Sequence, residues 1–411
     1  MKRLLSIMLI MAFAILPLSV FASGEGEQGG AAASGKVSFA LWTQEGESEG
    51  AFAFVQKLAN DFMDANPNVI IEVVQKDTEA LREDFQTASL AGSAPELLWT
   101  VSDHAGPFLA ANLIQPVDAM FNANNFIETV IVNNNAYAVP ISAGNHLMLL
   151  YNKSLVPNAP KTTDELISVA QGLTTGDMYG LVYNATEPFW LVPWLGGFDG
   201  KVFAADGVTP TLNTKAMRDT LQFLADLEFE HGVVPAESDY GTMDTLFKEG
   251  KAAMLINGDW SLGDYQGILG DDLGVAKIPT VSATGSDPAP YTSGKYFMVA
   301  EGVSGAKLDA VKSFIQFATS EAAMKEMVET LVRLPARLTT LQDPLVTSDP
   351  ILKGSAEQLA TGTPQPTNVE MRAVWDAMKP EMNAVLAGTK DAAAAAAAMQ
   401  AAAEATIATM Q

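Results

Sequence analysis

The sequence predicts an α/β fold made of two units, each with a sheet covered by helices. Strand and helix patterns alternate from Lys36 onward, and a second stretch of similar make-up begins after about residue 143. Segments that alternate in this way fold into a parallel sheet with helices on both faces. The 411 residues of the chain are enough for two domains of ordinary size.

The first unit shows its periodicity most clearly in one helix. Phe52, Val55, Ala59 and Phe62 recur three and four residues apart, which is the spacing of one helix face, and the sequence Asn-Pro-Asn at 66–68 ends it. Its neighbours are short apolar runs rich in β-branched residues, as expected of buried strands. The expected order is a strand at 37–42, a helix at 47–65, a strand at 69–74, a helix at 78–91 and a strand at 96–101.

The second unit follows a polar, glycine-containing joint at 142–146. We expect strands at 147–151, 250–256 and 294–300, with helices at 163–173, 215–231 and 310–319. The segment 391–411 contains seven consecutive alanines. Alanine is barely apolar but is the best helix former, and Gln400 and Glu404 interrupt the run, so we predict a helix packed on a lobe rather than a membrane segment.

The N-terminus is predicted to direct export. Lys2 and Arg3 precede an apolar run at 4–20, and Val20-Phe21-Ala22 provides small residues at a cleavage site. We therefore expect a signal peptide at 1–22, with an uncleaved membrane anchor as the alternative. Residues 23–35 are rich in Gly, Ala and Glu and are predicted to be a flexible linker. We expect a periplasmic or otherwise extracytoplasmic protein.

Composition excludes several classes of function. The formal net charge is −24, and a nucleic-acid ligand would require clustered Lys and Arg. The chain has no cysteine, which rules out disulfides, thiolate metal sites and a lipid anchor on an N-terminal Cys. Three widely spaced histidines do not favour a metal site, and we expect neither a metal nor a cofactor.

Polar and aromatic residues stand where two strands of the first unit end. Trp42-Thr43-Gln44-Glu45 follows one strand, and the segment 99–104 ends another. Ligands of open α/β sheets bind at the carboxyl ends of the strands. Sugars suit such a site, because their hydroxyls donate hydrogen bonds to planar acceptors such as carboxylates, while their C–H faces stack on aromatic rings.

These and other segments resemble a known family, the extracellular solute-binding proteins of ABC importers, and within it the maltose/maltodextrin-binding group. The resemblance covers about 36–411. The segments that carry it are VSFALWTQEG (37–46), LAGSAPELLW (90–99), AYAVPISAGNHLMLLYNKSLVPNAPKTTDEL (136–166), ATEPFWLVPWLGGFDG (185–200), FKEGKAAMLINGDWS (247–261) and NVEMRAVWDAM (368–378).

The resemblance implies a periplasmic-binding-protein type II fold, in which two α/β lobes close around a ligand cleft. It places an N-terminal lobe at 36–143 and 293–330, a C-terminal lobe at 147–290 and 335–411, and hinge crossovers at 144–146, 291–292 and 331–334. It further implies a monomer that binds maltose or maltodextrin and delivers it to the membrane subunits of an ABC importer, touching the membrane only through them.

Ligand-binding residues are carried over position by position. In the first lobe the resemblance assigns Trp42, Gln44 and Glu45, and then Asp103 and His104, where the family often has Asp followed by Arg. In the second lobe it assigns Glu187, Phe189 and Trp190, with Trp260 and Trp375 as stacking platforms. Asn145, near a hinge position where the prototype has Glu, and Tyr296 complete the set. Trp99 and Trp194 are expected in the core.

Two alternatives remain at the level of the sequence. A secreted glycoside hydrolase would also combine Trp, Asp and Glu, but it needs two carboxylates at a set separation, which nothing in the sequence imposes. The second alternative is a binding protein of the same fold for another sugar, a polyol or a glycerol phosphodiester. We expect a binding protein rather than an enzyme.

Overall fold

The computed structural model describes residues 35–47, 50–127, 129–236 and 238–410. Contacts separate Met1–Gly35 from Lys36–Gln411, and the fold presented below is that of the second part. The predicted signal peptide and, apart from Gly35, the predicted linker lie outside the described residues. Within the described ranges, no helix has both the length and the apolar character needed to cross a bilayer.

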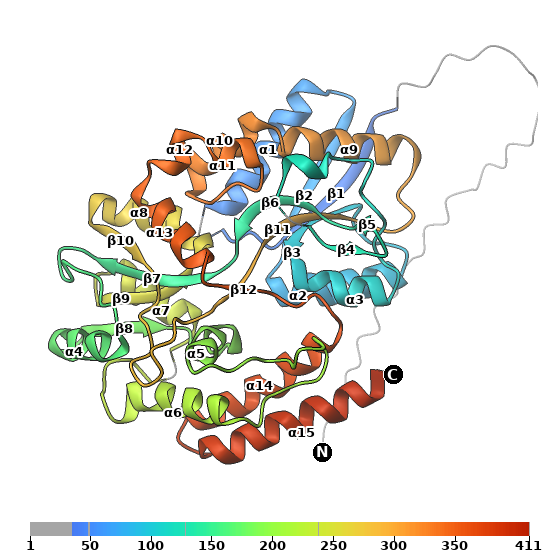
Figure 1. Cartoon of the computed structure of the whole chain (residues 1–411). Coiled ribbons are helices and arrows are strands. Elements are labelled where there is room, and N and C mark those ends of the chain that lie inside the picture. The colour runs from blue at the N-terminus through green and yellow to red at the C-terminus, as the bar shows by residue number, and fades with distance from the viewer. Residues whose placement is uncertain (1–34, 48–49, 128, 237, 411) are drawn as a thin grey trace, which may run out of the picture. The chain divides into compact units, whose positions relative to one another are not determined.

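The first of two main sheets has the strand order β12–β11–β3–β1–β2, with β6 paired to β11 (Figure 1). Its strands are β1 (Val37–Thr43), β2 (Val69–Gln75), β3 (Leu97–Val101), β6 (Val139–Gly144), β11 (Tyr291–Val299) and β12 (Thr363–Pro364). β1 runs parallel to both β2 and β3, as predicted from the alternating pattern. β11 runs antiparallel to β3 and to β6.

The sheet is therefore mixed: the prediction of a parallel sheet is confirmed for β1, β2 and β3 and is wrong for β11, which runs antiparallel to β3 and β6. The helical connections between β1, β2 and β3 return the chain to the same end, which makes those strands parallel. β11 enters from the other lobe at the carboxyl ends of β1 and β3, as its pairing of Lys295 with Val101 and Val299 with Leu97 shows. A strand that enters at that edge can only run in the opposite direction.

Helices cover both faces of this sheet, as predicted. Leu97 and Trp99 of β3 pack in one apolar cluster with α1 (Ala51–Ala65) and α9 (Gly305–Ala318), while Leu98 points into a second cluster with α2 (Thr78–Leu90) and α3 (Ala105–Ala110). This alternation follows from the two-residue repeat of a strand. Figure 1 shows α1 and α9 on one side of the strands and α2 and α3 on the other.

The first helix begins four residues later than the predicted start at 47. Gly50 adopts a left-handed conformation with φ of 68°, which lies outside the helical region, and α1 starts at Ala51. Its buried face consists of Ala51, Phe54, Val55, Leu58, Ala59 and Phe62. Phe62 meets Phe314 of α9 edge-on, with ring centroids 5.5 Å apart.

The second sheet has the order β10–β7–β9–β8. Its strands are β7 (Leu147–Asn152), β8 (Tyr179–Tyr183), β9 (Ala252–Gly258) and β10 (Leu273–Ala276). β7 is antiparallel to β9 and to β10, whereas β8 and β9 are parallel. A two-stranded hairpin of β4 (Ile131–Val132) and β5 (Asn135–Ala136) stands apart from both sheets.

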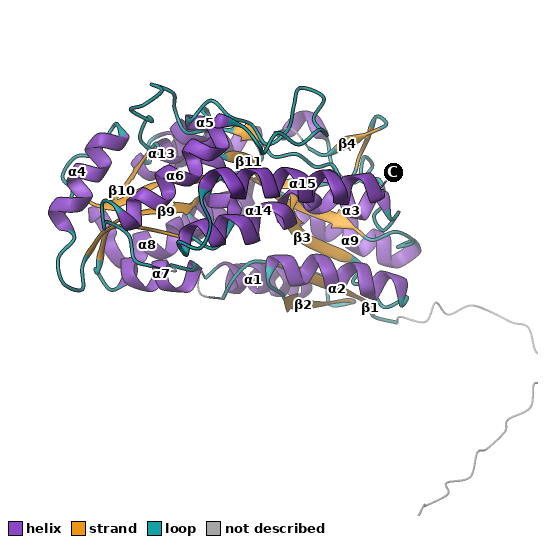
Figure 2. Ribbon diagram, turned by 90° about the horizontal axis from the view of Figure 1, so that it is seen from below, coloured by secondary structure: helices purple, strands orange, loops and turns teal. Residues whose placement is uncertain are grey.

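The helices of the second half complete a second lobe around this sheet. They are α4 (Thr163–Leu173), α5 (Val192–Gly197), α6 (Lys215–Phe229), α7 (Tyr240–Lys248), α8 (Leu262–Leu269), α13 (Pro350–Leu359), α14 (Glu370–Leu386) and α15 (Ala392–Met410). The alanine-rich α15 packs along α14 and against α6, which confirms a helix packed on a lobe (Figure 2). Its buried residues Ala395, Ala396, Met399 and Ala403 belong to the second-lobe core.

Three passages of the chain join the two lobes and lie side by side. They are the end of β6, the beginning of β11, and residues 332–336, which lie between α10 (Glu321–Leu331) and the short helices α11 (Leu338–Leu341) and α12 (Pro344–Thr347). β6 pairs with β11 on one side, and on its other side Ala143 N–H donates to Leu334 C=O at 2.9 Å and Ala336 N–H to Ile141 C=O at 3.1 Å.

Gly144 allows β6 to leave the first sheet. Its φ of 125° lies in the region that favours glycine, and a Cβ at this position would lie 2.5 Å from an Asp259 carboxylate oxygen. Strand β6 thus extends to Gly144, so the predicted joint at 142–146 is reduced to Asn145 and His146 before β7 begins.

Candidate functional site

Several of the predicted site residues follow the ends of four strands, and one lies within a helix. The stretch after β1 supplies Gln44 and Glu45, the turn after β3 supplies Asp103, and the turn after β9 supplies Trp260. Glu187 and Phe189 belong to a turn that follows β8, and Trp375 lies on α14. Since β1 and β3 end toward the second lobe, these residues face each other from the two halves of the fold.

Aromatic side chains of the second lobe gather into one cluster. The Phe189 ring centroid lies 6.2 Å from that of Trp260 and 6.4 Å from that of Trp375, and all three side chains are partly exposed. The Trp260 indole N–H donates to the Tyr240 hydroxyl at 2.9 Å. A Cβ on Gly258 would lie only 2.1 Å from the Trp260 ring, so the glycine lets that ring fold over the end of β9.

Trp190 supports this cluster from behind. Its side chain is 6% exposed, its ring meets those of Phe189 and Trp260 nearly edge-on, and its indole N–H donates to the Ile256 carbonyl at 2.8 Å. The structure thus brings Phe189, Trp190, Trp260 and Trp375 together, with Trp190 as the buried member. Trp99 and Trp194 are each 1% exposed, which confirms that both belong to the core.

Asp103 faces a narrow hollow between the two lobes. The hollow holds about 10 Å³, roughly the space of one water molecule. Its lining consists of Glu79, Arg82, Asp103, Pro107, Met371, Arg372 and Trp375. One carboxylate oxygen of Asp103 is buried without a hydrogen-bond partner in the described part of the chain. Burial, followed by the charge of Glu79, raises the pKa of Asp103 to about 6.

Charged side chains close this hollow from both lobes. Glu79 of α2 accepts from Arg82 on its own helix, at 3.2 and 3.3 Å, and from Arg372 of α14. Arg372 also donates to Asp376 at 2.5 Å. Farther along α14, Lys379 pairs with Glu187, so this predicted acceptor already carries a counter-ion.

Glu45 is engaged by the protein itself. Its two oxygens accept from the Trp99 indole N–H and from the Arg333 guanidinium, each at 2.8 Å. Burial by itself raises the pKa of Glu45, but the charges of Arg333 and Lys295 and the two hydrogen bonds hold it below its ordinary value. Each oxygen of Glu45 thus already accepts a hydrogen bond from the protein, and the residue is only 2% exposed, unlike the open acceptor that the resemblance implies.

The remaining predicted residues lie at the edge of the site or within the protein. His104 is 1% exposed and its Nδ1 lies 2.7 Å from the Thr100 hydroxyl, so it does not extend the Asp103 side chain as a cationic partner. Tyr296 packs in the first-lobe core with Phe85 and Leu98. Asn145, with φ of 45°, is buried between β6 and β7.

Trp42 lies on β1, and Gln44 follows the end of that strand. The Trp42 ring carries the Lys76 ammonium 4.4 Å from its centroid. The Gln44 side-chain oxygen is buried and lacks a hydrogen-bond partner within the described ranges.

Sequence reasoning missed Glu79, Arg82, Tyr240, Arg372 and Lys295. Arg372 had an available signal, because it lies one helical turn before Trp375 in the segment MRAVW. Lys295 had none. Its position on β11 places its ammonium 5.8 Å from the Trp260 ring centroid, across the lobes, and no local pattern marks that contact.

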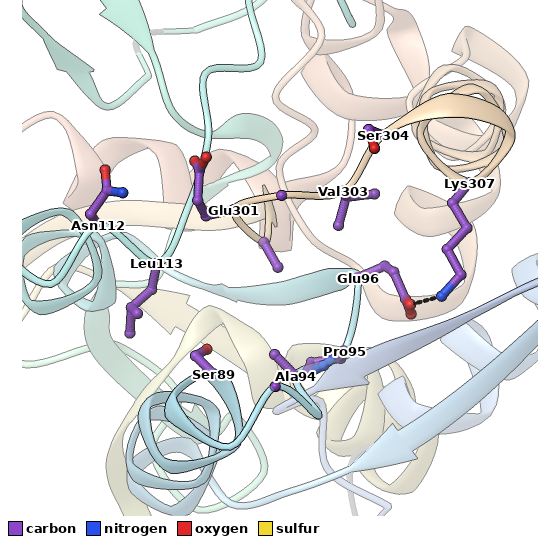
Figure 3. A pocket seen from close by; sticks show the side chains of 13 residues that line it. Ser89, Ala94, Pro95, Glu96, Asn112, Leu113, Glu301, Val303, Ser304 and Lys307 are labelled. Carbon is purple, nitrogen blue, oxygen red and sulfur yellow. Dashed lines mark hydrogen bonds and ion pairs between the residues drawn. The ribbon is translucent and has the colours of Figure 1, made fainter.

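A larger cavity lies elsewhere, at the opposite end of the first sheet. It has a volume of about 480 Å³ and is formed where β3 begins and β11 ends. Figure 3 shows Glu96 and Lys307, which form an ion pair at its rim, with Ser89, Asn112 and Glu301 around it. None of the predicted site residues lines this cavity. In the described ranges, no group of His, Asp or Glu is arranged to hold a metal ion.

The chain is similar in sequence to several proteins that are named for the oligosaccharides they bind. The maltotriose-binding protein of Pyrococcus abyssi is 27% identical over 349 residues, covering 82% of this chain and 75% of the relative. The galactooligosaccharide-binding protein of Bacillus subtilis is 24% identical over 409 residues, covering 95% of this chain and 94% of the relative.

Solved structures share the two-lobed type II periplasmic-binding-protein fold. The maltose/maltodextrin-binding domain MalE from Bdellovibrio bacteriovorus, bound to maltotriose, matches with a TM-score of 0.87 and 37% identity, covering 90% of this chain and 100% of that one. Residues 57–354, more than half of the sequence, match the family described as bacterial extracellular solute-binding protein. This chain belongs to the bacterial extracellular solute-binding protein family.

Proposed function

We propose that this protein binds an oligosaccharide, specifically a maltodextrin, in the cleft between its lobes. The observation that carries the proposal is the partly exposed aromatic cluster of Phe189, Trp260 and Trp375 beside Asp103. Flat rings offer surfaces for the C–H faces of sugar rings, and an unsatisfied carboxylate oxygen accepts from hydroxyls. Within the resemblance, Asp103, Phe189, Trp260 and Trp375 are therefore the direct ligand contacts that the geometry supports best.

We propose maltodextrin as the first candidate ligand because two similar proteins are named with maltotriose. The Pyrococcus abyssi protein is a maltotriose-binding protein, and the Bdellovibrio bacteriovorus domain was solved with maltotriose. The Bacillus subtilis relative supports a second candidate, a galacto-oligosaccharide. His104, where the family often has Arg, is a position at which the sugar preference can differ.

We infer that the lobes separate to admit the sugar and close on it. Support comes from the hollow beside Asp103, which is too small for a sugar ring, and from the Glu79–Arg372 pair across it. The lobes would comprise 36–143 with 293–330 and 147–290 with 335–411, with hinges at 144–146, 291–292 and 331–334. A ligand that contacts both lobes binds the closed form better and shifts the population toward it.

Delivery to an ABC importer completes the proposal. A Streptococcus pneumoniae relative is named a maltooligosaccharide ABC transporter solute-binding lipoprotein, which supports an importer as partner. We propose export by the signal peptide at 1–22 without a lipid anchor on cysteine, since the sequence has none. The protein would act as a monomer without a cofactor, and as a binder rather than an enzyme.

Calorimetric titration of the purified mature chain tests the ligand. Maltose and maltotriose should bind, while cellobiose, trehalose and β-linked galacto-oligosaccharides should bind more weakly or not at all. A response to galacto-oligosaccharide without one to maltotriose would replace the first candidate by the second. Release of glucose from maltotriose during long incubation would contradict the assignment as a binder without catalysis.

A further inference from the structure

Arg333 lies in the third passage between the lobes and is almost wholly enclosed. Its side chain is 1% exposed, one of the largest fully buried side chains in the described chain. The preceding Val332 adopts φ of 53° and ψ of 46°, a left-handed conformation that is costly for a β-branched residue. Hydrogen bonds from Ala143 to Leu334 and from Ala336 to Ile141 fix the backbone on the following side.

The guanidinium joins the segments that follow two strands, one in each lobe. One terminal nitrogen donates to Glu45 after β1 at 2.8 Å, and the other donates to the Trp260 carbonyl after β9 at 3.1 Å. The second oxygen of Glu45 accepts from the indole N–H of Trp99 on β3. Arg333 thus connects the carboxyl edge of the first sheet to the backbone of an aromatic residue in the proposed sugar site.

Two anchors fix Trp260 through these contacts. Arg333 holds its main-chain carbonyl, and Tyr240 holds its ring nitrogen at 2.9 Å. Arginine is suited to the first task because its planar fork presents donors in fixed directions to two acceptors at once. A lysine at 333 would keep the charge but, with its single ammonium on a flexible stem, would not reproduce the pair of directed bonds.

We propose that Arg333, with Glu45 as its counter-ion, is a positioning residue for ligand binding that sets Trp260 relative to the first lobe. This inference rests on the proposed sugar-binding function. Arg333 does not touch the sugar. It holds the stacking ring where a sugar bound at Asp103 would meet it, so the sugar does not have to order that ring on binding.

The test uses Arg333→Lys and Glu45→Gln in the mature chain. Arg218→Lys serves as the matched control, because Arg218 on α6 donates to the Asn213 side chain at the surface. We expect Arg333→Lys and Glu45→Gln to weaken maltotriose binding by about 2- to 30-fold, chiefly through faster dissociation. The control should keep the affinity of the unchanged protein. Stopped-flow tryptophan fluorescence gives both rate constants, and thermal unfolding shows that each variant is folded.

An independent readout is the indole N–H resonance of Trp260, assigned through its loss in Trp260→Phe. It should shift in Arg333→Lys and not in Arg218→Lys, even without sugar. Folded variants with unchanged affinity and an unshifted resonance would overturn the positioning role, as would a lowered unfolding temperature with unchanged affinity. If Arg333→Lys does not fold, Glu45→Gln decides by the same criteria. If the unchanged protein does not bind maltotriose but the Trp260 resonance still shifts in Arg333→Lys, the proposed maltodextrin binding is refuted. The inference that Arg333 positions Trp260 is then still supported.

Discussion

Glu45 and Asp103 carry the same functional group at the ends of neighbouring strands, yet their surroundings differ. Glu45 has both oxygens engaged by Trp99 and Arg333, and its pKa is lowered. Asp103 keeps a buried oxygen without a partner in the described ranges, and its pKa is raised to about 6. A carboxylate that lacks donors gains most from a sugar hydroxyl, so we expect ligand binding and proton binding to compete at Asp103.

The affinity for maltotriose should therefore fall with decreasing pH. Sugar hydroxyls favour the ionised carboxylate, and below about pH 6 the sugar must displace a proton from Asp103, at a cost of up to about tenfold in affinity per pH unit. Between about pH 7 and pH 8 the affinity should be flat. Calorimetric titrations with maltotriose, from below about pH 6 up to about pH 8, measure how the affinity depends on pH. Asp103→Asn should bind more weakly at neutral pH and lose the dependence, and an equally steep profile in that variant would assign the effect to another group.

The aromatic cluster makes a second prediction for single residues. Trp260→Ala and Trp375→Ala should each weaken binding by about 1–3 kcal/mol, a figure taken from the stacking of bases on aromatic side chains. Trp194→Phe is the control, because Trp194 is buried in the core and should affect stability without changing the affinity of the folded protein. Titration of all three with maltotriose decides, and alanine variants that bind as tightly as the unchanged protein would exclude stacking.

At the scale of elements, the sequence predicted what local patterns encode. The apolar repeat located α1, and the β-branched runs located β1 and β2, because burial of one face forces those periods. The direction of β11 was not predictable, since it depends on where the chain returns from the other lobe. The partners of Glu45 were equally hidden, because Arg333 lies 288 residues away in the sequence and only the fold brings the two together.

Helices α2 and α14 are connected beside the hollow at Asp103 through Glu79, which accepts from Arg82 and Arg372. The side chains are partly exposed, and a single exposed pair contributes little, so we expect Glu79→Gln to weaken maltotriose binding by less than about tenfold. The same variant should move the pH profile of binding to lower pH, because the charge of Glu79 contributes to the raised pKa of Asp103.

Glu83→Gln provides the matched control for this contact. Glu83 lies on the same helix and also pairs with Arg82, at 2.9 Å, but within the described ranges it forms no ion pair with α14. Its affinity and pH profile should match those of the unchanged protein. Identical profiles for Glu79→Gln and Glu83→Gln would show that the α2–α14 contact does not act on the site.

At the scale of the whole molecule, the burial of His104 links the stability of the fold to pH. His104, predicted as a ligand contact, is enclosed beside Thr100 and Phe108. Burial, together with the charges of Arg82 and Lys295, lowers its pKa to about 3. Its type and its place after Asp103 were readable from the sequence. Its burial was not, because α3 and β11 close over it only in the folded chain.

This buried imidazole should make the fold sensitive to acid. Between about pH 6.5 and pH 3 the unfolded chain binds a proton at His104 and the folded chain does not, so the free energy of unfolding decreases as the pH falls, by up to about 1.4 kcal/mol per pH unit. His104→Asn removes that proton site, and the free energy of unfolding of this variant should therefore decrease less between about pH 7 and pH 5. Urea unfolding at both pH values measures the difference. Equal losses for His104→Asn and the unchanged protein would show that His104 titrates alike in both states, which would contradict its enclosure in the folded chain.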